Sequence, residues 1–454
     1  MKAVRFYLML MFSVLMLGKL NAQQLFLPPA CFDVGLGARY LISADFNNDG
    51  DLDIATSDWY GGTASVILGN GDGTFNTAHT YNVGTDPQSI CTADFNSDGF
   101  LDLATANPFS NDISLLYGLG NGQFTIGPPI TLDIPMWIIS ADFNNDGKAD
   151  LAVALNNEGR IAILTGDGNG GFTIQKYSAG GKYPWRITSA DFNVDGKMDL
   201  AISNMGDGLA LLKGNGSGGF VTTDSFINIP INIHSLVIAD INFDGKMDLV
   251  CSQDGMVYYK YIDTNVKFDI VNSPIFAAAQ VNPNFNGICV EDFNEDGKLD
   301  IAASRQACDS IAMIIGTPGA PDSVFSIEAK NYYATCAHMP YGMLTADFNN
   351  DGHADLAASN EGGSNVSIFM NKLTAPNTIL QQELELKSGG IVVYPNPASK
   401  VIMIKTAWTG KRELYDAAGV LQSDTMGDEM DISQFAKGVY FLKCGDSVRK
   451  VTID

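Results

Sequence analysis

The feature that most constrains the fold of this chain is a twelve-residue motif that returns seven times along 454 residues. The first copy, ADFNNDGDLDIA, runs from 44 to 55. The first aspartates of successive copies lie 48 to 55 residues apart and are Asp45, Asp94, Asp142, Asp191, Asp240, Asp292 and Asp347. Self-similarity at such a period is typical of a propeller or a solenoid. The chain is therefore predicted to consist mainly of seven similar units.

Each motif has the oxygen donors of a calcium loop. Positions 1, 3, 5 and 9 have carboxylate or amide side chains, position 7 offers its backbone carbonyl, and Gly at position 6 allows the sharp turn. Ca²⁺ takes roughly six to eight hard oxygen ligands, so we expect up to seven structural Ca²⁺ ions. The predicted ligand residues are Asp45, Asn47, Asp49, Asp51, Asp53, Asp94, Asn96, Asp98, Phe100, Asp102, Asp142, Asn144, Asp146, Lys148, Asp150, Asp191, Asn193, Asp195, Lys197, Asp199, Asp240, Asn242, Asp244, Lys246, Asp248, Asp292, Asn294, Asp296, Lys298, Asp300, Asp347, Asn349, Asp351, His353 and Asp355.

The residues after each loop argue against a helical calcium sensor. Such a sensor closes its loop with a bidentate Glu at position 12. That position is Thr56, Thr105, Val153, Ile202, Cys251, Ala303 or Ala358 in this chain. After Asp53 the sequence IATS is a short apolar run typical of a strand. We therefore expect a strand, not a helix, to leave each loop.

Each repeat has room for four strands. In the first repeat these are YLISA, DIATS, ASVIL and a strand after the turn GNGDGTF, where Gly permits positive φ. Four antiparallel strands per repeat describe a propeller blade. Apolar residues four positions before each first Asp are expected to pack between blades; they are Leu41, Ile90, Ile138, Ile187, Leu236, Ile288 and Met343.

The two ends of the repeat region complement each other. The seventh repeat ends after its third strand, whereas residues 26–35 align without gaps with 75–84, which include the fourth strand of the first repeat. We expect this N-terminal strand to complete the seventh blade, which leaves only short, protected edges. The predicted fold class is all-β, with a seven-bladed β-propeller at 23–373 closed by its N-terminal strand, and a small β-sandwich domain after it.

The termini indicate export. Residues 1–22 have two early basic residues, an apolar stretch too short for a transmembrane helix, and Ala22 at a plausible cleavage point, so we expect a signal peptide. Residues 374–389 form a polar stretch that is predicted to be a linker. A short β-rich domain is expected at 390–454. No transmembrane segment is predicted after signal removal, and we expect a secreted or surface-located monomer.

The net charge of −24 disfavours nucleic acid as a partner. Much of this charge belongs to the loops, because three aspartates in each of seven loops account for 21 of the 51 acidic residues. The charge is therefore mainly a property of the predicted metal sites.

Seven cysteines in an exported chain raise the question of disulfides. Cys91, Cys251 and Cys289 lie in apolar strand contexts, where a small buried residue is expected. Cys308 and Cys336 are both expected on the face opposite the calcium loops, where a bridge between them is one of two open alternatives. Neither Cys31 nor Cys444 has an evident partner.

The seven motifs resemble the FG-GAP repeats of integrin alpha-chain propellers and of their bacterial relatives, which are also described as VCBS repeats. This resemblance implies a seven-bladed propeller with structural Ca²⁺ in the loops that join first and second strands. The C-terminal segments YPNP, ELYDAAGV, GVYFLK and VRKVTID resemble a type IX secretion sorting domain. That resemblance implies Sec export, passage across an outer membrane with the secretion machinery as a partner, and then cleavage or surface anchoring.

Neither resemblance names a ligand, so we look at the positions where the repeats differ. Five and six residues before each first Asp, on the face opposite the calcium loops, several repeats have aromatic, Arg or His residues. The candidates for ligand binding are Arg39, Tyr40, Trp137, Trp185, Arg186, His234 and Tyr341. Weaker candidates on the same face are Trp59, Tyr60 and Phe109. Such side chains suit stacking on sugars or docking of a protein segment, and the alternative is that they fill the mouth of a central channel.

Three classes of function remain. The sequence favours an extracellular recognition or adhesion module for a glycan or a protein. A polysaccharide lyase or hydrolase is the second class, and a passive structural protein is the third. No catalytic residues are assigned, because the chain has four His residues, no G-x-S-x-G and no phosphate-binding loop. His234, beside the Arg and aromatic residues, is the position to test for catalysis, and the side chain of His353 is expected in solvent.

Overall fold

The computed structural model of the chain divides into two compact units, Met1–Lys372 and Leu373–Asp454. The structure describes residues 25–205, 207–227, 233–241, 245, 247–253, 256–260, 274–277, 285–316 and 330–372 of the first unit. In the second it describes 373, 391–394, 401–406, 411–416, 421–425, 429–432, 435, 438–444 and 447–453. The predicted signal peptide at 1–22 and linker at 374–389 lie outside the described residues, as do the predicted ligands Asn242, Asp244 and Lys246.

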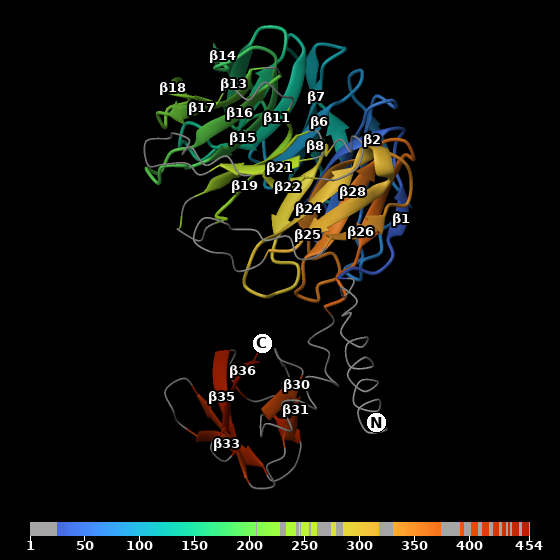
Figure 1. Cartoon of the computed structure of the whole chain (residues 1–454), viewed down its shortest axis with the longest axis vertical. Helices are drawn as coiled ribbons and strands as arrows, with labels where there is room; N and C mark the ends of the chain where they lie inside the picture. The colour runs from blue at the N-terminus through green and yellow to red at the C-terminus, as the bar shows by residue number, and fades with distance from the viewer. Residues whose placement is uncertain are drawn as a thin grey trace, which may run out of the picture. The chain divides into compact units, whose positions relative to one another are not determined.

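The described part of the first unit contains seven antiparallel sheets that resemble propeller blades (Figure 1). Their strands are, sheet by sheet, β2 (Ala38–Ala44), β3 (Asp53–Asp58), β4 (Thr63–Ile67) and β5 (His79–Asn82); β6 (Ser89–Ala93), β7 (Asp102–Asn107), β8 (Asp112–Gly118), β9 (Phe124–Ile126) and β10 (Ile130–Thr131); β11 (Pro135–Ala141), β12 (Asp150–Leu155), β13 (Arg160–Gly166) and β14 (Phe172–Ser178); β15 (Pro184–Ala190), β16 (Asp199–Asn204), β17 (Gly208–Gly214) and β18 (Phe220–Ile227); β19 (Ile233–Ala239), β20 (Asp248–Gln253), β21 (Met256–Lys260) and β22 (Pro274–Ala277); β23 (Ile288–Glu291), β24 (Asp300–Arg305), β25 (Ser310–Ile314) and β26 (Lys330–Ala334); and β27 (Pro340–Ala346), β28 (Asp355–Asn360) and β29 (Asn365–Phe369) with β1 (Ala30–Asp33).

These sheets are called the first to seventh sheet below. Within each, neighbouring strands are consecutive in sequence, with two exceptions. In the second sheet the outermost position is shared by β9 and β10, which both pair with β8. In the seventh sheet the outermost strand is β1, from the other end of the unit. A short 3₁₀ helix, Gln306–Cys308, joins β24 to β25.

The N-terminal strand completes the seventh sheet, as expected from the alignment of the two ends. Ala30 of β1 lies opposite Ile368 of β29, and Asp33 lies opposite Asn365. In the first sheet, the fourth strand β5 pairs with β4 in the same way. His79 and Asn82, which lie 49 residues after Ala30 and Asp33, are opposite Val66 and Thr63. Figure 1 shows the blue β1 beside the orange strands of this sheet.

Apolar side chains from two sheets meet between sheets that follow each other in sequence. Between the second and third sheets, for example, Leu115 packs in one cluster with Ile138 and Val153. A similar cluster lies between the first and seventh sheets, where Leu41 and Ile54 pack with Val366. All seven residues that the sequence places between blades lie in such clusters or against them: Leu41, Ile90, Ile138, Ile187, Leu236, Ile288 and Met343. The first strands of adjacent sheets are also in contact, and β2 contacts β27 as well as β6.

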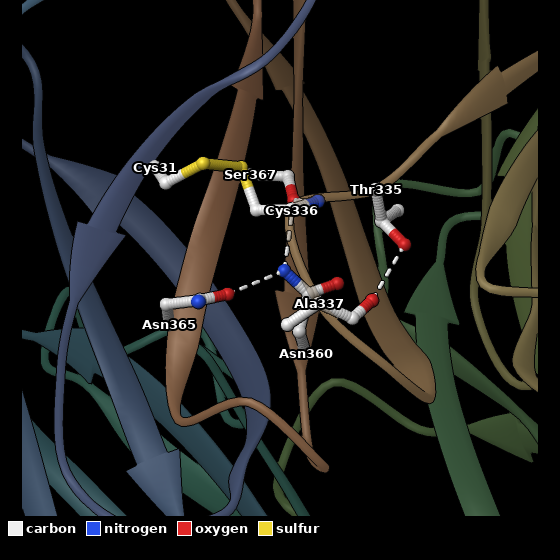
Figure 2. The surroundings of a disulfide bond; sticks show 7 residues. All are labelled: Cys31, Thr335, Cys336, Ala337, Asn360, Asn365 and Ser367. Carbon is white, nitrogen blue, oxygen red and sulfur yellow. Dashed lines mark hydrogen bonds between the residues drawn. A yellow bond between two sulfur atoms is a disulfide. The ribbon is translucent and has the colours of Figure 1, made fainter.

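The first unit contains a disulfide, but it is not the Cys308–Cys336 bridge that the sequence left open. Cys336 is bonded to Cys31 of β1 and not to Cys308 (Figure 2 shows the bond). Cys308 is exposed and free. The backbone N–H of Cys336 also donates to Ser367 Oγ of β29. The bond thus ties β1 to the segment that leads into the same sheet. Cys91, Cys251 and Cys289 are buried thiols, as expected.

The described part of the second unit contains two sheets with one shared apolar core. One consists of β30 (Ile391–Tyr394), β31 (Val401–Thr406) and β34 (Glu429–Asp431); the other of β33 (Leu421–Thr425), β32 (Arg412–Asp416), β35 (Gly438–Cys444) and β36 (Ser447–Ile453). Ile404 and Met430 from the first pack with Leu414 and Leu442 from the second, as in a β-sandwich. In the part of the chain that the structure describes, no helix is long and apolar enough to cross a membrane.

Candidate functional site

Each aspartate loop is organised by hydrogen bonds from its own backbone to its carboxylates. In the first loop, Asp45 accepts the N–H groups of Asp49 and Gly50, at 3.2 and 2.9 Å. Asp49 in turn accepts the N–H of Asp51 at 2.9 Å. Gly50 has φ of 93°, which favours glycine at this position. The sequence therefore fixes the side chains at positions 1 and 5 around one turn.

The aspartate at position 9 anchors the loop to the rest of its sheet. Asp53 is fully buried, and its Oδ2 accepts the N–H of Phe46 at 2.8 Å while its Oδ1 accepts the N–H of Gly69 at 2.8 Å. Burial raises the pKa of Asp53 to about 6, and the nearby charges of Asp49 and Asp45 act in the same direction. Equivalent aspartates make the same pair of bonds in four other loops: Asp102, Asp150, Asp300 and Asp355.

The side-chain oxygens in these loops are of the chemical type that a hard divalent cation prefers as ligands. Asp45 and Asp49 supply carboxylate oxygens and Asn47 an amide oxygen, and an oxygen that accepts one N–H keeps a lone pair for a cation. Among the described residues, no three His, Cys, Asp or Glu side chains are arranged as a metal-binding group. A cation in the loop would therefore depend on amide and carbonyl oxygens as well as on carboxylates.

Side chains at position 4 of one loop reach the turn of the following loop. Asn350 of the seventh loop donates to Asp51 Oδ1 of the first at 2.7 Å, and Asn145 of the third donates to the carbonyl of Gly196 in the fourth at 3.5 Å. In the same way Glu295 contacts His353 of the seventh loop. The side chain of His353 is 11% exposed. The expectation that it lies in solvent was wrong, because Glu295 of the neighbouring loop covers it.

On the opposite edge of the sheets, β-bulges place the predicted ligand-binding residues. The register of the first and second strands shifts between Ala38 and Tyr40, which leaves Arg39 as the extra residue in β2. The same shift surrounds Trp185 in β15 and His234 in β19. A bulge changes the direction in which side chains leave a strand. These positions therefore differ in orientation from the rest of their strands.

In the first, fourth and seventh sheets, a serine of the second strand supports a residue at the bulge. Ser57 Oγ accepts the N–H of Tyr40 at 3.2 Å, and Ser203 Oγ accepts that of Arg186 at 3.1 Å. The backbone N–H of Gly342 is bonded in the same way to Ser359 at 3.0 Å. Because the bulge interrupts the strand ladder, the hydroxyl satisfies a donor that would otherwise lack a partner.

Arg186 lies at the centre of an arginine–aromatic cluster that we define by Arg39, Tyr40, Trp59, Trp137, Arg186 and Tyr341. Its guanidinium lies 3.8 Å from the ring centre of Trp137 and 4.3 Å from that of Tyr40. Its Nη2 donates to the carbonyl of Asn286 at 3.1 Å. The residue is 2% exposed, and this burial lowers the pKa of Arg186 to about 9. The arginine still carries its charge at neutral pH.

Arg39 has the corresponding place at the other side of the cluster. Its guanidinium lies 3.8 Å from the ring centre of Trp59 and 4.6 Å from that of Tyr341. Among the described residues, Nε and Nη1 of Arg39 and Nε of Arg186 are buried without a hydrogen-bond partner. The cluster thus brings residues from the first, third, fourth and seventh sheets together, and its cations are held mainly by aromatic rings.

Two of the predicted residues are not members of this cluster. Trp185 lies half-buried at the bulge of β15, next to Arg186, and His234 lies half-buried at the bulge of β19. Sequence reasoning missed the carbonyl of Asn286, which accepts hydrogen bonds from Arg186 and from the hydroxyl of Tyr40. A backbone carbonyl leaves no sequence signal. Trp59 was ranked as a weaker candidate, although it pairs directly with Arg39.

Exposed apolar side chains lie next to this cluster. Tyr60 is 57% exposed, Leu36 is 60% exposed and Phe109 is 67% exposed. Trp59 connects them to the cluster, since its ring meets that of Phe109 edge to face at 5.7 Å. Side chains of this size are rarely exposed together without a role. We name Leu36, Trp59, Tyr60 and Phe109 the Trp59 patch.

Two family descriptions match this chain. A model of the FG-GAP-like repeat matches residues 45–105, 94–153, 142–202 and 195–251. A model of the secretion system C-terminal sorting domain matches residues 392–453. Both resemblances drawn from the sequence motifs are confirmed. No curated protein matches the chain.

Solved structures resemble this chain at low sequence identity. BBS1N, solved in complex with ARL6DN, has a TM-score of 0.52 at 12% identity over 77% of this chain and 99% of that chain. A protein from Desulfotomaculum acetoxidans has a TM-score of 0.48 at 12% identity over 66% of this chain and 90% of that chain. A lectin from Agrocybe aegerita that recognises non-reducing terminal N-acetylglucosamine has a TM-score of 0.48 at 17% identity over 72% and 87%. The first likeness supports the propeller-like fold alone.

Proposed function

This chain is an FG-GAP repeat protein that its sorting domain directs through type IX secretion to the cell surface or the exterior, and we propose that it acts there as a calcium-binding recognition module. Its ligand would be an extracellular glycan or protein. The face that carries the arginine–aromatic cluster and the Trp59 patch would bind it. The secretion machinery is a partner through the sorting domain.

We infer that the seven sheets form one closed ring of seven blades. The first and seventh sheets share an apolar cluster, and β2 contacts β27. The hydroxyl of Ser359 donates to the carbonyl of Arg39 at 2.7 Å, as that of Ser304 donates to the carbonyl of Tyr341 at 2.9 Å. The junction between the seventh and first sheets therefore has the same hydrogen bond as an internal junction.

The proposed calcium ions would be structural. Positions 1, 3 and 5 of each loop would bind the ion through side chains and position 7 through its carbonyl, with position 9 holding the loop in place. A bound cation would offset the repulsion between carboxylates such as Asp45 and Asp49. It would thereby hold the turns that lie on the face opposite the recognition surface.

One observation carries the recognition proposal: aromatic side chains gather on one face, and some of them are left in solvent. Arg39 packs on Trp59, while Tyr60 and Phe109 next to it are more than half exposed. Large apolar side chains fixed at a surface are typical of binding hot spots. The aspartate loops repeat in every sheet, whereas this aromatic group does not, so it suits a specific ligand.

The test is binding of the mature chain, with calcium present, to arrays of glycans and of extracellular matrix proteins. We expect saturable binding to one class of ligand that Arg39→Ala weakens. No binding to any class would argue for a passive structural protein. Release of products from a polysaccharide panel, lost in the His234→Ala variant, would instead identify an enzyme.

A further inference from the structure

The Trp59 patch is built on a turn that its neighbours hold in place. The N–H of Trp59 donates to the carbonyl of Gly37 at 2.9 Å, and the N–H of Gly61 donates to the carbonyl of Leu36 at 2.8 Å. Gly37 has φ of 80°, and a Cβ there would lie 2.5 Å from the ring of Tyr60. The backbone that carries Trp59 and Tyr60 is therefore held in place before a ligand binds, which reduces the entropic cost of binding.

Hydrogen-bond donors and acceptors border the aromatic rings of the patch. The hydroxyl of Tyr60 is a donor and an acceptor, and this residue is 57% exposed. The charges of Glu361 and Asp86 raise the pKa of Tyr60, so both carboxylates lie near its hydroxyl. The patch thus has exposed ring surface with hydrogen-bonding groups of both senses at its border.

We propose, building on the recognition function above, that the Trp59 patch is a stacking site for a neutral carbohydrate. The rings of Tyr60 and Phe109 would take the apolar C–H face of a sugar, and Tyr60 and Asp86 would bind its hydroxyls. Sugar hydroxyls both donate and accept hydrogen bonds, which matches the mixed set of polar groups at the border.

Aromatic rings also bind basic side chains and charged polymers, and two features of the patch disfavour these ligands. The position over Trp59 that a basic side chain would take is already filled by the guanidinium of Arg39, at 3.8 Å. A strongly acidic ligand would approach a chain of net charge −24 and meet Glu361 and Asp86 beside the patch. A neutral polyhydroxylated ligand avoids both conflicts.

The distribution of aromatic residues among the turns predicts how many sugar sites the chain has. In the turns between second and third strands, the first sheet has Trp59 with Tyr60 and the second sheet has Phe109, while the third has Asn156 with Asn157. The seventh sheet has Glu361 followed by two glycines at this turn. A binding site that needs aromatic rings from adjacent turns therefore forms once, and we expect one sugar site per chain.

The experiment is titration of the mature full chain, with calcium present, against neutral oligosaccharides chosen from the glycan array. Isothermal calorimetry is expected to give a stoichiometry of one. Phe109→Ala and Tyr60→Ala should each lower affinity about tenfold or more, with unchanged melting temperatures because both side chains are exposed. Tyr183→Ala is the matched control: this tyrosine is 53% exposed on the segment that precedes β15, and its loss should leave affinity unchanged.

Three outcomes would overturn the proposal while leaving the recognition function intact. The first is sugar binding that Phe109→Ala and Tyr60→Ala do not change. The second is a stoichiometry of several sugars per chain. The third is tight binding of uronic-acid polymers or of lysine-rich peptides, with neutral sugars inactive. Absence of binding to every array component would instead remove the recognition function itself.

Discussion

Cys31 of the N-terminal strand is bonded to Cys336, 305 residues further along the chain. Reducing this bond should lower the free energy of unfolding by about 2 to 4 kcal/mol, because the crosslink restricts the unfolded chain across a very long loop. Thermal unfolding with and without a reductant measures the effect. Replacing both cysteines by serine should reproduce it.

Cys308→Ser is the control for that experiment, because Cys308 is exposed and free. This variant should unfold at the same temperature as the wild type and show the same response to the reductant. Peptide mapping that found Cys308 bridged to Cys336 would contradict the observed pairing.

Deleting residues 23–35 should abolish cooperative folding of the propeller unit. This change removes β1 and leaves β29 as an open edge, and it also removes Phe26, which packs in the core between the sixth and seventh sheets. Circular dichroism during thermal unfolding is the measurement. A truncated chain that melted as sharply and at the same temperature as the wild type would argue against closure through β1.

Removing calcium should lower the melting temperature, since an ion bound by the folded state alone stabilises it by mass action, by about 2.7 kcal/mol per site at 100 times its Kd. Scans in chelator and at increasing calcium test this. Asp94→Asn removes one carboxylate from the second loop, and its single amide oxygen can keep one of the two bonds that Asp94 accepts from the N–H groups of Asp98 and Gly99. Native mass spectrometry should then count one ion fewer, and equal counts would contradict a site in that loop.

Stability should also depend on pH through Asp58. This carboxyl is buried, and burial raises its pKa from 3.8 to about 6. The folded state therefore holds a proton that the unfolded state releases between these values. The stabilisation is fully present below pH 3.8 and is lost as the pH rises through 6, with an upper limit of about 3 kcal/mol.

Asp58→Asn should remove this part of the pH dependence. The chain itself has asparagine at the equivalent places, where Asn107 donates to Ser114 and Asn360 donates to Ser367. Urea unfolding of both proteins at pH 5 and pH 7.5 measures the difference between them, in which the effects of other aspartates cancel. Equal pH dependence in the two proteins would show that Asp58 does not titrate in this range.

The sequence predicts the repeats and the place of β1 correctly because both depend on spacing alone. The disulfide was harder. The register of β25 with β26, extended past Ser310 and Ala334, places Cys308 opposite Cys336. That ladder ends at Asp309, whose φ of 46° turns the chain away and leaves Cys308 exposed. A change of one residue from extended to left-handed backbone is not visible in composition or periodicity.

The candidate site shows the same limit. The residues that differ between repeats are recognisable in the sequence, and six of the ten candidates meet in the arginine–aromatic cluster. The sequence did not show which of them face inward. A bulge adds one residue to a strand without a characteristic sequence, and it directs Arg186 into the protein while Tyr60 and Phe109, on turns, remain exposed.

Val194→Asn should stabilise the protein. Val194 is at position 4 of the fourth loop with φ of 58°, where other loops have Asn48, Asn145 or Asn350 at nearly the same angle. A β-branched residue is strained in the left-handed region, and asparagine is not, so the free energy of unfolding should rise by about 1 kcal/mol. The melting temperature should rise by about 1 to 3 °C. Val221 is equally exposed but lies in the extended strand β18, and Val221→Asn should give no gain; a similar gain at both positions would trace the effect to the added polar group instead of backbone strain.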